Sequence, residues 1–82
     1  MALSHQQGRQ IVRTVTHIMD TLDRSWLDLR GQCSDRDFAE YGEKVSTALE
    51  SLTGDVLLPL FQDHPELEPL ADEELAKLRQ DQ

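Results

Sequence analysis

The sequence has few cysteines, few aromatic residues and no long apolar run, and each shortage excludes a class of protein. Its single cysteine, Cys33, rules out an internal disulfide and a paired-thiol redox motif. The longest apolar stretch, Val56 to Phe61, contains Pro59 and is far shorter than the ~20 residues that span a bilayer. The first residues have no basic start followed by an apolar run. We therefore expect no signal peptide, no membrane association and a cytoplasmic location.

Basic residues are also scarce. The 82 residues include 8 Lys and Arg against 16 Asp and Glu, a formal net charge of −8. Direct binding to DNA or RNA relies on Lys and Arg that displace counterions from phosphates, so we expect no nucleic-acid partner. The acids are concentrated after residue 30. There they could complement a basic partner surface, although charge of this density also simply keeps a small protein soluble.

The length limits what the chain can bury by itself. An 82-residue chain holds at most one domain, and chains this short bury only about 60% of their unfolded surface. Without disulfides, a common supplement to so small a core is a partner surface. We therefore expect residues 1–82 to form one small domain that oligomerises or binds another protein, with residues 1–4 and 80–82 frayed.

Apolar residues recur at helical spacing in a first long segment, residues 5–30. Six of them follow one another at steps of three and four, which places them on one helical stripe. Gly31 then suits the left-handed position that commonly follows a helix end. The six residues are Ile11, Val15, Ile18, Leu22, Trp26 and Leu29.

A second segment, residues 34–63, has the same character. It begins at Ser34, whose hydroxyl can cap a helix with acids in its first turn. Its stripe stays in phase across Gly54, so we prefer one continuous or nearly collinear helix and leave open a break or kink near Gly54 or Pro59. The main stripe residues are Phe38, Tyr41, Val45, Leu49 and Leu52.

The remaining chain predicts one more helix. His64 and Pro65 end the second segment, and Pro69 with its neighbouring acids predicts a short helix over residues 69–79. The fold class is therefore all-α: an antiparallel hairpin of residues 5–30 and 34–63 with a short C-terminal helix. We expect oligomerisation to complete a helical bundle.

The two stripes also predict the binding surface, because they are longer than one small domain can cover. Trp26 and Tyr41 have an apolar body and a polar tip, which suits residues that anchor a partner, although packing within one chain is the commoner role. The predicted partner or oligomer interface comprises Ile11, Val15, Ile18, Leu22, Trp26, Phe38, Tyr41, Val45, Leu49 and Leu52.

Residues that could carry chemistry are few and scattered. His17 and Asp20 lie off the apolar stripe, whereas metal sites in bundles need several carboxylates directed inward. The acids and histidine of residues 63–68 lack the Gly-centred loop of a calcium site and indicate a hydrated connection. A nucleophilic role for Cys33 would need a histidine that the fold brings near it. With no phosphate loop or nucleophile motif, we expect no catalytic residue, metal site, cofactor or enzymatic activity.

Two short segments, Asp20-Thr21-Leu22-Asp23-Arg24 and Ser34-Asp35-Arg36-Asp37-Phe38-Ala39-Glu40-Tyr41, are followed by Leu49, Leu52-Thr53 and Leu57. In this order and spacing, residues 20–57 resemble the middle of the haemolysin expression-modulating family (Hha/YmoA). That family is small and all-helical, lacks its own sequence-specific DNA reading, and binds the dimerisation region of H-NS-type nucleoid proteins through acidic residues. The resemblance implies a protein partner contacted by Asp23.

The sequence also departs from that family. Asp23 is the only one of the family's acidic contact residues that has a match, and Ser46 stands where the family has an acid. The basic run before the first matched segment and the Pro/Trp-containing end are absent. These departures put the family's mode of binding in doubt for this chain.

Length, acidity and two stripes joined by a short turn are also similar to the small helical-hairpin co-chaperones of type III secretion. Those proteins protect a secreted subunit by pairing with a larger chaperone. Our main functional prediction is therefore a protein that acts through protein–protein interaction, as a self-associating or regulatory adaptor protein. A secretion co-chaperone is the first alternative, and a metal-binding or catalytic helical protein is the second.

Overall fold

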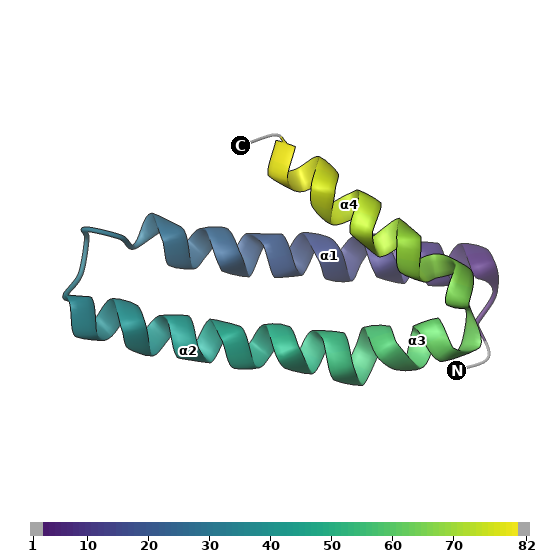
Figure 1. Cartoon of the computed structure of the whole chain (residues 1–82), viewed down its shortest axis with the longest axis horizontal. Helices are drawn as coiled ribbons and strands as arrows, with labels where there is room; N and C mark the ends of the chain where they lie inside the picture. The colour runs from purple at the N-terminus through teal and green to yellow at the C-terminus, as the bar shows by residue number, and fades with distance from the viewer. Residues whose placement is uncertain (1–2, 81–82) are drawn as a thin grey trace.

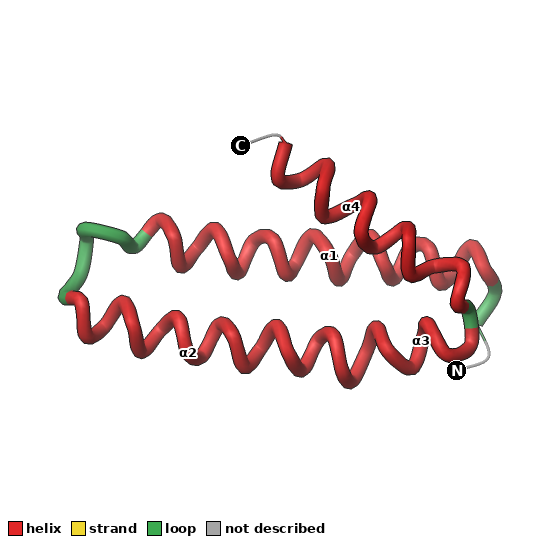
Figure 2. Tube along the Cα trace, in the orientation of Figure 1, coloured by secondary structure: helices red, strands yellow, loops and turns green. Residues whose placement is uncertain are grey.

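The computed structural model describes residues 3–80, and all the regular elements among them are helical (Figures 1 and 2). The all-helical prediction is thus confirmed for this part of the chain. In chain order the elements are α1 (His5–Asp28), α2 (Asp35–Ser51), a π-helical segment (Leu52–Leu57), α3 (Leu58–Asp63), a 3₁₀ turn (Pro65–Leu67) and α4 (Glu68–Gln80).

The start of α1 is held by a reciprocal cap. The Ser4 hydroxyl accepts a hydrogen bond from the Gln7 backbone N–H at 3.1 Å, and the Gln7 side chain accepts one from the Ser4 N–H at 2.9 Å. Such a box satisfies two backbone donors that the helix itself leaves unpaired. Leu3, which precedes this cap, is half-buried against the core. The expected fraying of residues 1–4 and 80–82 stays a prediction, and residues 1–2 and 81–82 lie outside the described residues.

The chain reverses direction between α1 and α2. Gly31 has φ of +82°, a left-handed conformation that glycine adopts without the steric cost of a Cβ. Ser34 then caps α2, because its hydroxyl accepts a hydrogen bond from the Asp37 N–H at 3.1 Å. Figure 1 shows α1 and α2 lying side by side with opposite directions after this turn.

Helical structure runs without interruption from α2 to Asp63, but it passes through a π-helical turn. In that turn the Leu58 N–H donates to the Thr53 carbonyl, five residues back. The turn lies immediately before Pro59, whose ring would clash with the carbonyl four residues earlier in a regular α-helix. The wider π-turn makes room for the ring, so the proline is accommodated without breaking the helix.

The π-turn also rotates the residues that follow it. One extra residue in a turn shifts later side chains by about 100° around the helix axis. Leu57 is consequently buried, with 4% of its surface exposed, whereas regular α-helical spacing places it away from the stripe. Leu58, the next residue, is 52% exposed.

The core lies at the end of the molecule where α1, α3 and α4 meet. α4 packs against α1 and crosses it at an angle, so its C-terminal end diverges from the α1–α2 pair (Figure 1). Thr16 is fully buried beside this core and donates its hydroxyl proton to the Val12 carbonyl at 2.8 Å. The buried apolar residues of the core are Val12, Val15, Leu57, Leu60, Leu67 and Ala71.

The molecule is long and flat. Its Cα atoms extend over 45 × 25 × 14 Å, with a radius of gyration of 14.5 Å. A compact domain of this length has a radius of gyration of about 12 Å. The half of the hairpin far from the core is therefore a pair of helices with little else packed on it.

Candidate interaction surface

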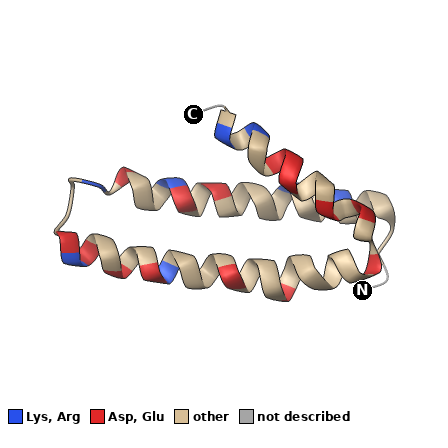
Figure 3. Cartoon of the chain, viewed as in Figure 1, with Lys and Arg blue, Asp and Glu red and all other residues tan. Residues whose placement is uncertain are grey.

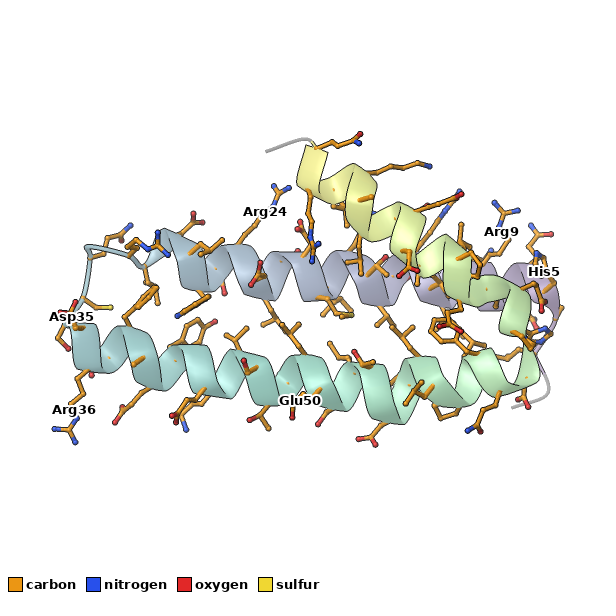
Figure 4. All side chains as sticks on the ribbon, viewed as in Figure 1. His5, Arg9, Arg24, Asp35, Arg36 and Glu50 are labelled. Carbon is orange, nitrogen blue, oxygen red and sulfur yellow. The ribbon has the colours of Figure 1, made fainter. Side chains whose placement is uncertain are left out.

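The Arg and Asp residues of α1 all lie on one side of that helix. Successive residues turn by about 100° around the axis, so residues separated by four, seven or eleven positions point in similar directions. Figure 4 shows Arg9 and Arg24 extending from the edge of α1 that faces away from α2. The charged side of α1 comprises Arg9, Arg13, Asp20, Asp23, Arg24 and Asp28.

The other side of α1 carries a strip of uncharged residues beyond those that form the core. Ile18 is 44% exposed in the middle of this strip. Ile11 and Leu22, seven residues before it and four after it, are half-buried, and Thr14 is exposed. An apolar side chain that remains this exposed between two partly covered ones marks a face that the chain itself leaves open.

Tyr41 of α2 borders the same strip. Its hydroxyl lies 2.9 Å from the Ser25 hydroxyl of α1, and this hydrogen bond joins the two helices at the edge of the strip. Ala48 is seven residues further along α2, on the same helical face, and is half-buried. The exposed Lys44 lies between these two residues on that side of α2. We call the uncharged face the surface formed by Ile11, Thr14, Ile18, Leu22 and Ser25 of α1 together with Tyr41 and Ala48 of α2.

α4 packs on the charged side of α1 and leaves the uncharged face open. Arg13 forms an ion pair with the nearly buried Glu74 of α4 at 3.5 Å. Arg24 donates a hydrogen bond from Nη2 to the Leu78 carbonyl at 2.9 Å and pairs with Asp20 at 2.9 Å. Figure 3 shows charged residues distributed along the length of both α1 and α2. On α1, the charged side and the uncharged face therefore lie opposite each other.

Aromatic residues connect α1 with α2 at the turn end of the hairpin. Trp26 stacks on Phe38 with ring centroids 4.8 Å apart, and its Nε1–H donates to the Phe38 carbonyl at 2.9 Å. The Arg30 guanidinium lies over the Phe38 ring at 5.8 Å. The polar tips of Trp26 and Tyr41 are therefore both engaged within the chain. Their role in this structure is to align α1 with α2.

The predicted interface residues fall into three groups. Val15 and Val45 are buried within the single chain, with 7% and 4% of their surfaces exposed. Ile18 is exposed. The remaining predicted residues are half-buried, in positions that a second chain could cover further: Ile11, Leu22, Trp26, Phe38, Tyr41, Leu49 and Leu52.

Asp23, the residue that the family resemblance selects, is exposed on the charged side of α1. It lies at a shallow depression between the hairpin and the C-terminal end of α4. That depression is lined by Met19, Asp20, Asp23, Leu49, Leu75 and Arg79. Asp23 and the uncharged face therefore belong to different surfaces of the molecule.

Sequence reasoning missed several residues that the fold buries or exposes. Leu67 and Ala71 are buried by the packing of α4 on α1, and no local sequence pattern predicts this contact. Gly8 is buried beside Leu67, and a Cβ at Gly8 would approach Leu67 Cδ1. Leu27 is 38% exposed on the charged side of α1. The positions of the α1 charges could have identified the uncharged face directly.

A histidine cluster joins the chain start to the α3–α4 connection. His64 Nε2–H donates to the Leu3 carbonyl at 2.6 Å, and its Nδ1 lies 3.2 Å from a Glu66 carboxylate oxygen. Glu66 is also 3.0 Å from His5 Nδ1. The hydrogen bond to Leu3 and the nearby Glu66 carboxylate raise the pKa of His64, against the opposing effect of partial burial. The hydrogen bond from His5 is the main cause that lowers the pKa of Glu66.

The other residues considered for chemistry remain isolated. His17 is exposed. Cys33 is half-buried, and its Sγ lies 3.7 Å from the Leu29 carbonyl oxygen. Among residues 3–80, no three His, Cys, Asp or Glu side chains are placed to hold a metal ion together.

The comparisons with known proteins add no relative to this picture. No family model matches the chain, and no curated protein or solved structure matches it. The resemblance of residues 20–57 to the Hha/YmoA family therefore stays a prediction. Within the described part of the chain, no helix combines the length and the apolar character needed to cross a membrane.

Proposed function

We propose that this protein is a non-enzymatic interaction module that binds another polypeptide chain through the uncharged face. The observation that carries the proposal is the separation of charge on α1. Its Arg and Asp residues lie on the side where α4 packs, while the 44% exposed Ile18 lies on a side that contains none of them. A helix face with this composition is suited to packing against a helix of a second chain.

The energetics support burial of this face. Complete burial of a large aliphatic side chain contributes roughly 1.5 to 3 kcal/mol. Covering the exposed part of Ile18 would therefore contribute about 1 kcal/mol, and the half-buried Ile11 and Leu22 would add similar or smaller amounts. Central apolar residues of this kind, surrounded by polar residues, have the arrangement of an interface core and its rim.

The acidic periphery gives the module a means of selecting partners. Charges at the rim of an interface mainly change the rate of association and the discrimination between partners, and contribute less to affinity. The acids along α2 would thus favour partners with basic residues beside an apolar strip.

A matched pair of substitutions tests the proposal. Ile18→Glu and Leu27→Glu each place a carboxylate at an exposed apolar position of α1, 44% and 38% exposed in the native chain. Ile18 lies on the uncharged face and Leu27 on the charged side, so only the first should abolish binding. Affinity capture from the native cell at a fixed ratio, with helicity checked by circular dichroism, measures this. Equal retention of the captured protein by both variants would contradict the proposal.

Asp23 offers a second mode of binding, because it is exposed at the depression between the hairpin and α4. The family resemblance implies that an acidic residue at this position contacts the partner. An Asp23→Lys variant that loses the captured protein, together with an Ile18→Glu variant that keeps it, would favour this mode over the uncharged face. The reverse result would favour the uncharged face.

A further inference from the structure

The molecule exposes more surface than a compact protein of its mass. Its accessible surface is 5719 Å². A compact monomer of 9.4 kDa exposes about 5000 Å², so the chain carries an excess of about 700 Å². A stable protein–protein interface of standard size removes about 800 Å² from each partner. The excess surface is therefore close to what one additional protein contact would cover.

The open side of the α1–α2 pair, which has the uncharged face at its centre, has dimensions that agree with that area. α1 has 24 residues and is thus about 36 Å long. Two packed helices, with axes 8–10 Å apart, present a face about 20 Å wide including side chains. The product is about 700 Å², which lies near the area per partner of a standard interface. This side of the α1–α2 pair could therefore pack against a second α-helical hairpin of the same size.

The residues of this face are self-complementary about Ile18. In an antiparallel pair of α1 helices related by a two-fold axis at Ile18, residues equally distant from position 18 meet. Ile18 then contacts its own copy, and Thr14 contacts Leu22 because each is four positions away. Ile11 contacts Ser25 at a distance of seven positions. Every pair joins an apolar residue to an apolar or small hydroxyl-bearing residue, as an isologous two-fold interface requires.

The charges of α1 do not oppose this arrangement. A chain with a formal net charge of −8 repels its own copies unless the charges lie away from the contact. The Arg and Asp residues of α1 are on its opposite side. On α2, Tyr41 and Ala48 contribute to the face, and the exposed Lys44 between them can extend its ammonium group to the edge of the contact. A pairing through the uncharged face therefore buries none of the α1 charges.

From these observations we infer that the occupant of the uncharged face is a second copy of this chain. The two α1–α2 pairs form an antiparallel four-helix bundle around a two-fold axis at Ile18. This inference rests on the proposed function, since it names the polypeptide that the interaction module binds. Antiparallel helices packed at about 20° are the usual geometry of such bundles.

Sedimentation equilibrium of the full chain over a wide concentration range tests the pairing. The native chain should sediment as a dimer, at twice its mass of 9.4 kDa, and dissociate on dilution. Ile18→Glu should sediment as a monomer at every concentration, whereas Leu27→Glu should remain dimeric. A native chain that is monomeric throughout, or equal dimerisation of the two variants, would overturn the inference.

Disulfide cross-linking tests the two-fold axis and does not depend on the effect of a buried carboxylate on folding. In a Cys33→Ser background, Ile18→Cys should form a covalent dimer rapidly under mild oxidation, because position 18 meets its own copy. Leu27→Cys in the same background should cross-link only at the slow rate expected from random collisions between chains. Equal rates for the two variants, or faster cross-linking through position 27, would contradict the proposed axis.

The outcomes separate this inference from the proposed function. If the native chain is monomeric but captures another protein, and Ile18→Glu abolishes that capture, the second-copy inference is wrong and the proposed interaction module is supported. A native chain that dimerises, with Ile18→Glu neither dissociating the dimer nor releasing any captured protein, removes the uncharged face from both proposals.

Discussion

The contact between Gly42 and Trp26 gives the sharpest prediction about the fold, because it decides whether a Gly→Ala substitution stabilises or destabilises the protein. Alanine is favoured over glycine inside a helix by about 1 kcal/mol. At Gly42, however, a Cβ would lie 2.8 Å from Trp26 Nε1 and 2.9 Å from Trp26 Cε2. Real Cβ atoms do not approach other atoms so closely, so the indole ring must move.

The ring has little freedom to move without loss. Trp26 is stacked on Phe38 and donates its indole N–H to the Phe38 carbonyl. Displacement would weaken a stacking contact of about 0.5–1.5 kcal/mol and a hydrogen bond of similar size. These losses exceed the gain from helix propensity, so we expect Gly42→Ala to destabilise the fold by about 1 kcal/mol.

Gly54→Ala is the matched control. Gly54 also lies within helical structure, but nothing lies within 4 Å of a Cβ placed there. The gain in helix propensity then has no opposing contact, and we expect Gly54→Ala to stabilise the fold by up to about 1 kcal/mol. The two variants should differ by about 2 kcal/mol, equivalent to about 10 °C in Tm for a domain of this size.

Urea denaturation followed by circular dichroism measures both variants at one fixed protein concentration, because dimerisation would make stability depend on concentration. Trp26 is the only tryptophan, so native-state fluorescence independently reports whether its ring has moved in Gly42→Ala. If Gly42→Ala is as stable as Gly54→Ala and leaves the fluorescence unchanged, the packing described for the turn end of the hairpin is wrong.

The remaining predictions concern the core and the histidine cluster. Leu60→Ala should cost about 2–5 kcal/mol because Leu60 is fully buried, whereas Leu58→Ala should change stability by less than ~0.5 kcal/mol since Leu58 is 52% exposed; equal urea midpoints would refute the assignment of the core. The raised pKa of His64 means that its contribution to stability is complete below the unfolded-state pKa of 6.5 and is lost as the pH rises through the folded-state pKa. His64→Gln should therefore lose most stability relative to the native chain near pH 6 and progressively less toward pH 9, and a stability difference that grows with pH would contradict the proposed role. The lowered pKa of Glu66 acts in the opposite direction, since its contribution is present above pH 4.5 and disappears as the pH falls through the folded-state pKa. The two groups together predict a stability maximum in mildly acidic solution, which denaturation curves across pH 3–9 would reveal or exclude.

Local chemical signals account for the parts of the fold that the sequence predicts well. Gly31 occupies the left-handed position expected of it, and Ser34 caps α2 with its side chain. Both effects depend on backbone geometry within a few residues, which the sequence specifies directly. Helix positions could therefore be predicted to within a few residues along most of the chain.

The core could not be predicted to the same extent because it depends on two non-local features. Leu57 reaches the core only because the π-turn before Pro59 rotates it there. Leu67 and Ala71 are buried only because α4 folds back onto α1. Helical periodicity assumes a constant turn angle within one helix, so it contains no information on either feature.

The candidate surface was predicted in part. The apolar face of α1 is broad, and the stripe alone does not say which edge faces α4 and which remains open. The stripe predicts burial of Ile18 together with Val15. In the structure, the edge of α1 that contains Val12 packs in the core with Ala71 of α4, and Ile18, on the other edge, stays exposed. The distribution of charge along α1 is the local signal that distinguishes the two edges, because ionised side chains avoid an apolar contact.

The most direct test of the central claim compares the solvent accessibility of two side chains in the assembled protein. Ile18 and Leu27 are similarly exposed in the single chain, at 44% and 38%. Methyl-resolved NMR with a soluble paramagnetic probe, at a concentration where the complex forms, reports the exposure of each. The account predicts strong protection of the Ile18 methyl groups and none for Leu27. Equal broadening of both sets of signals would contradict it.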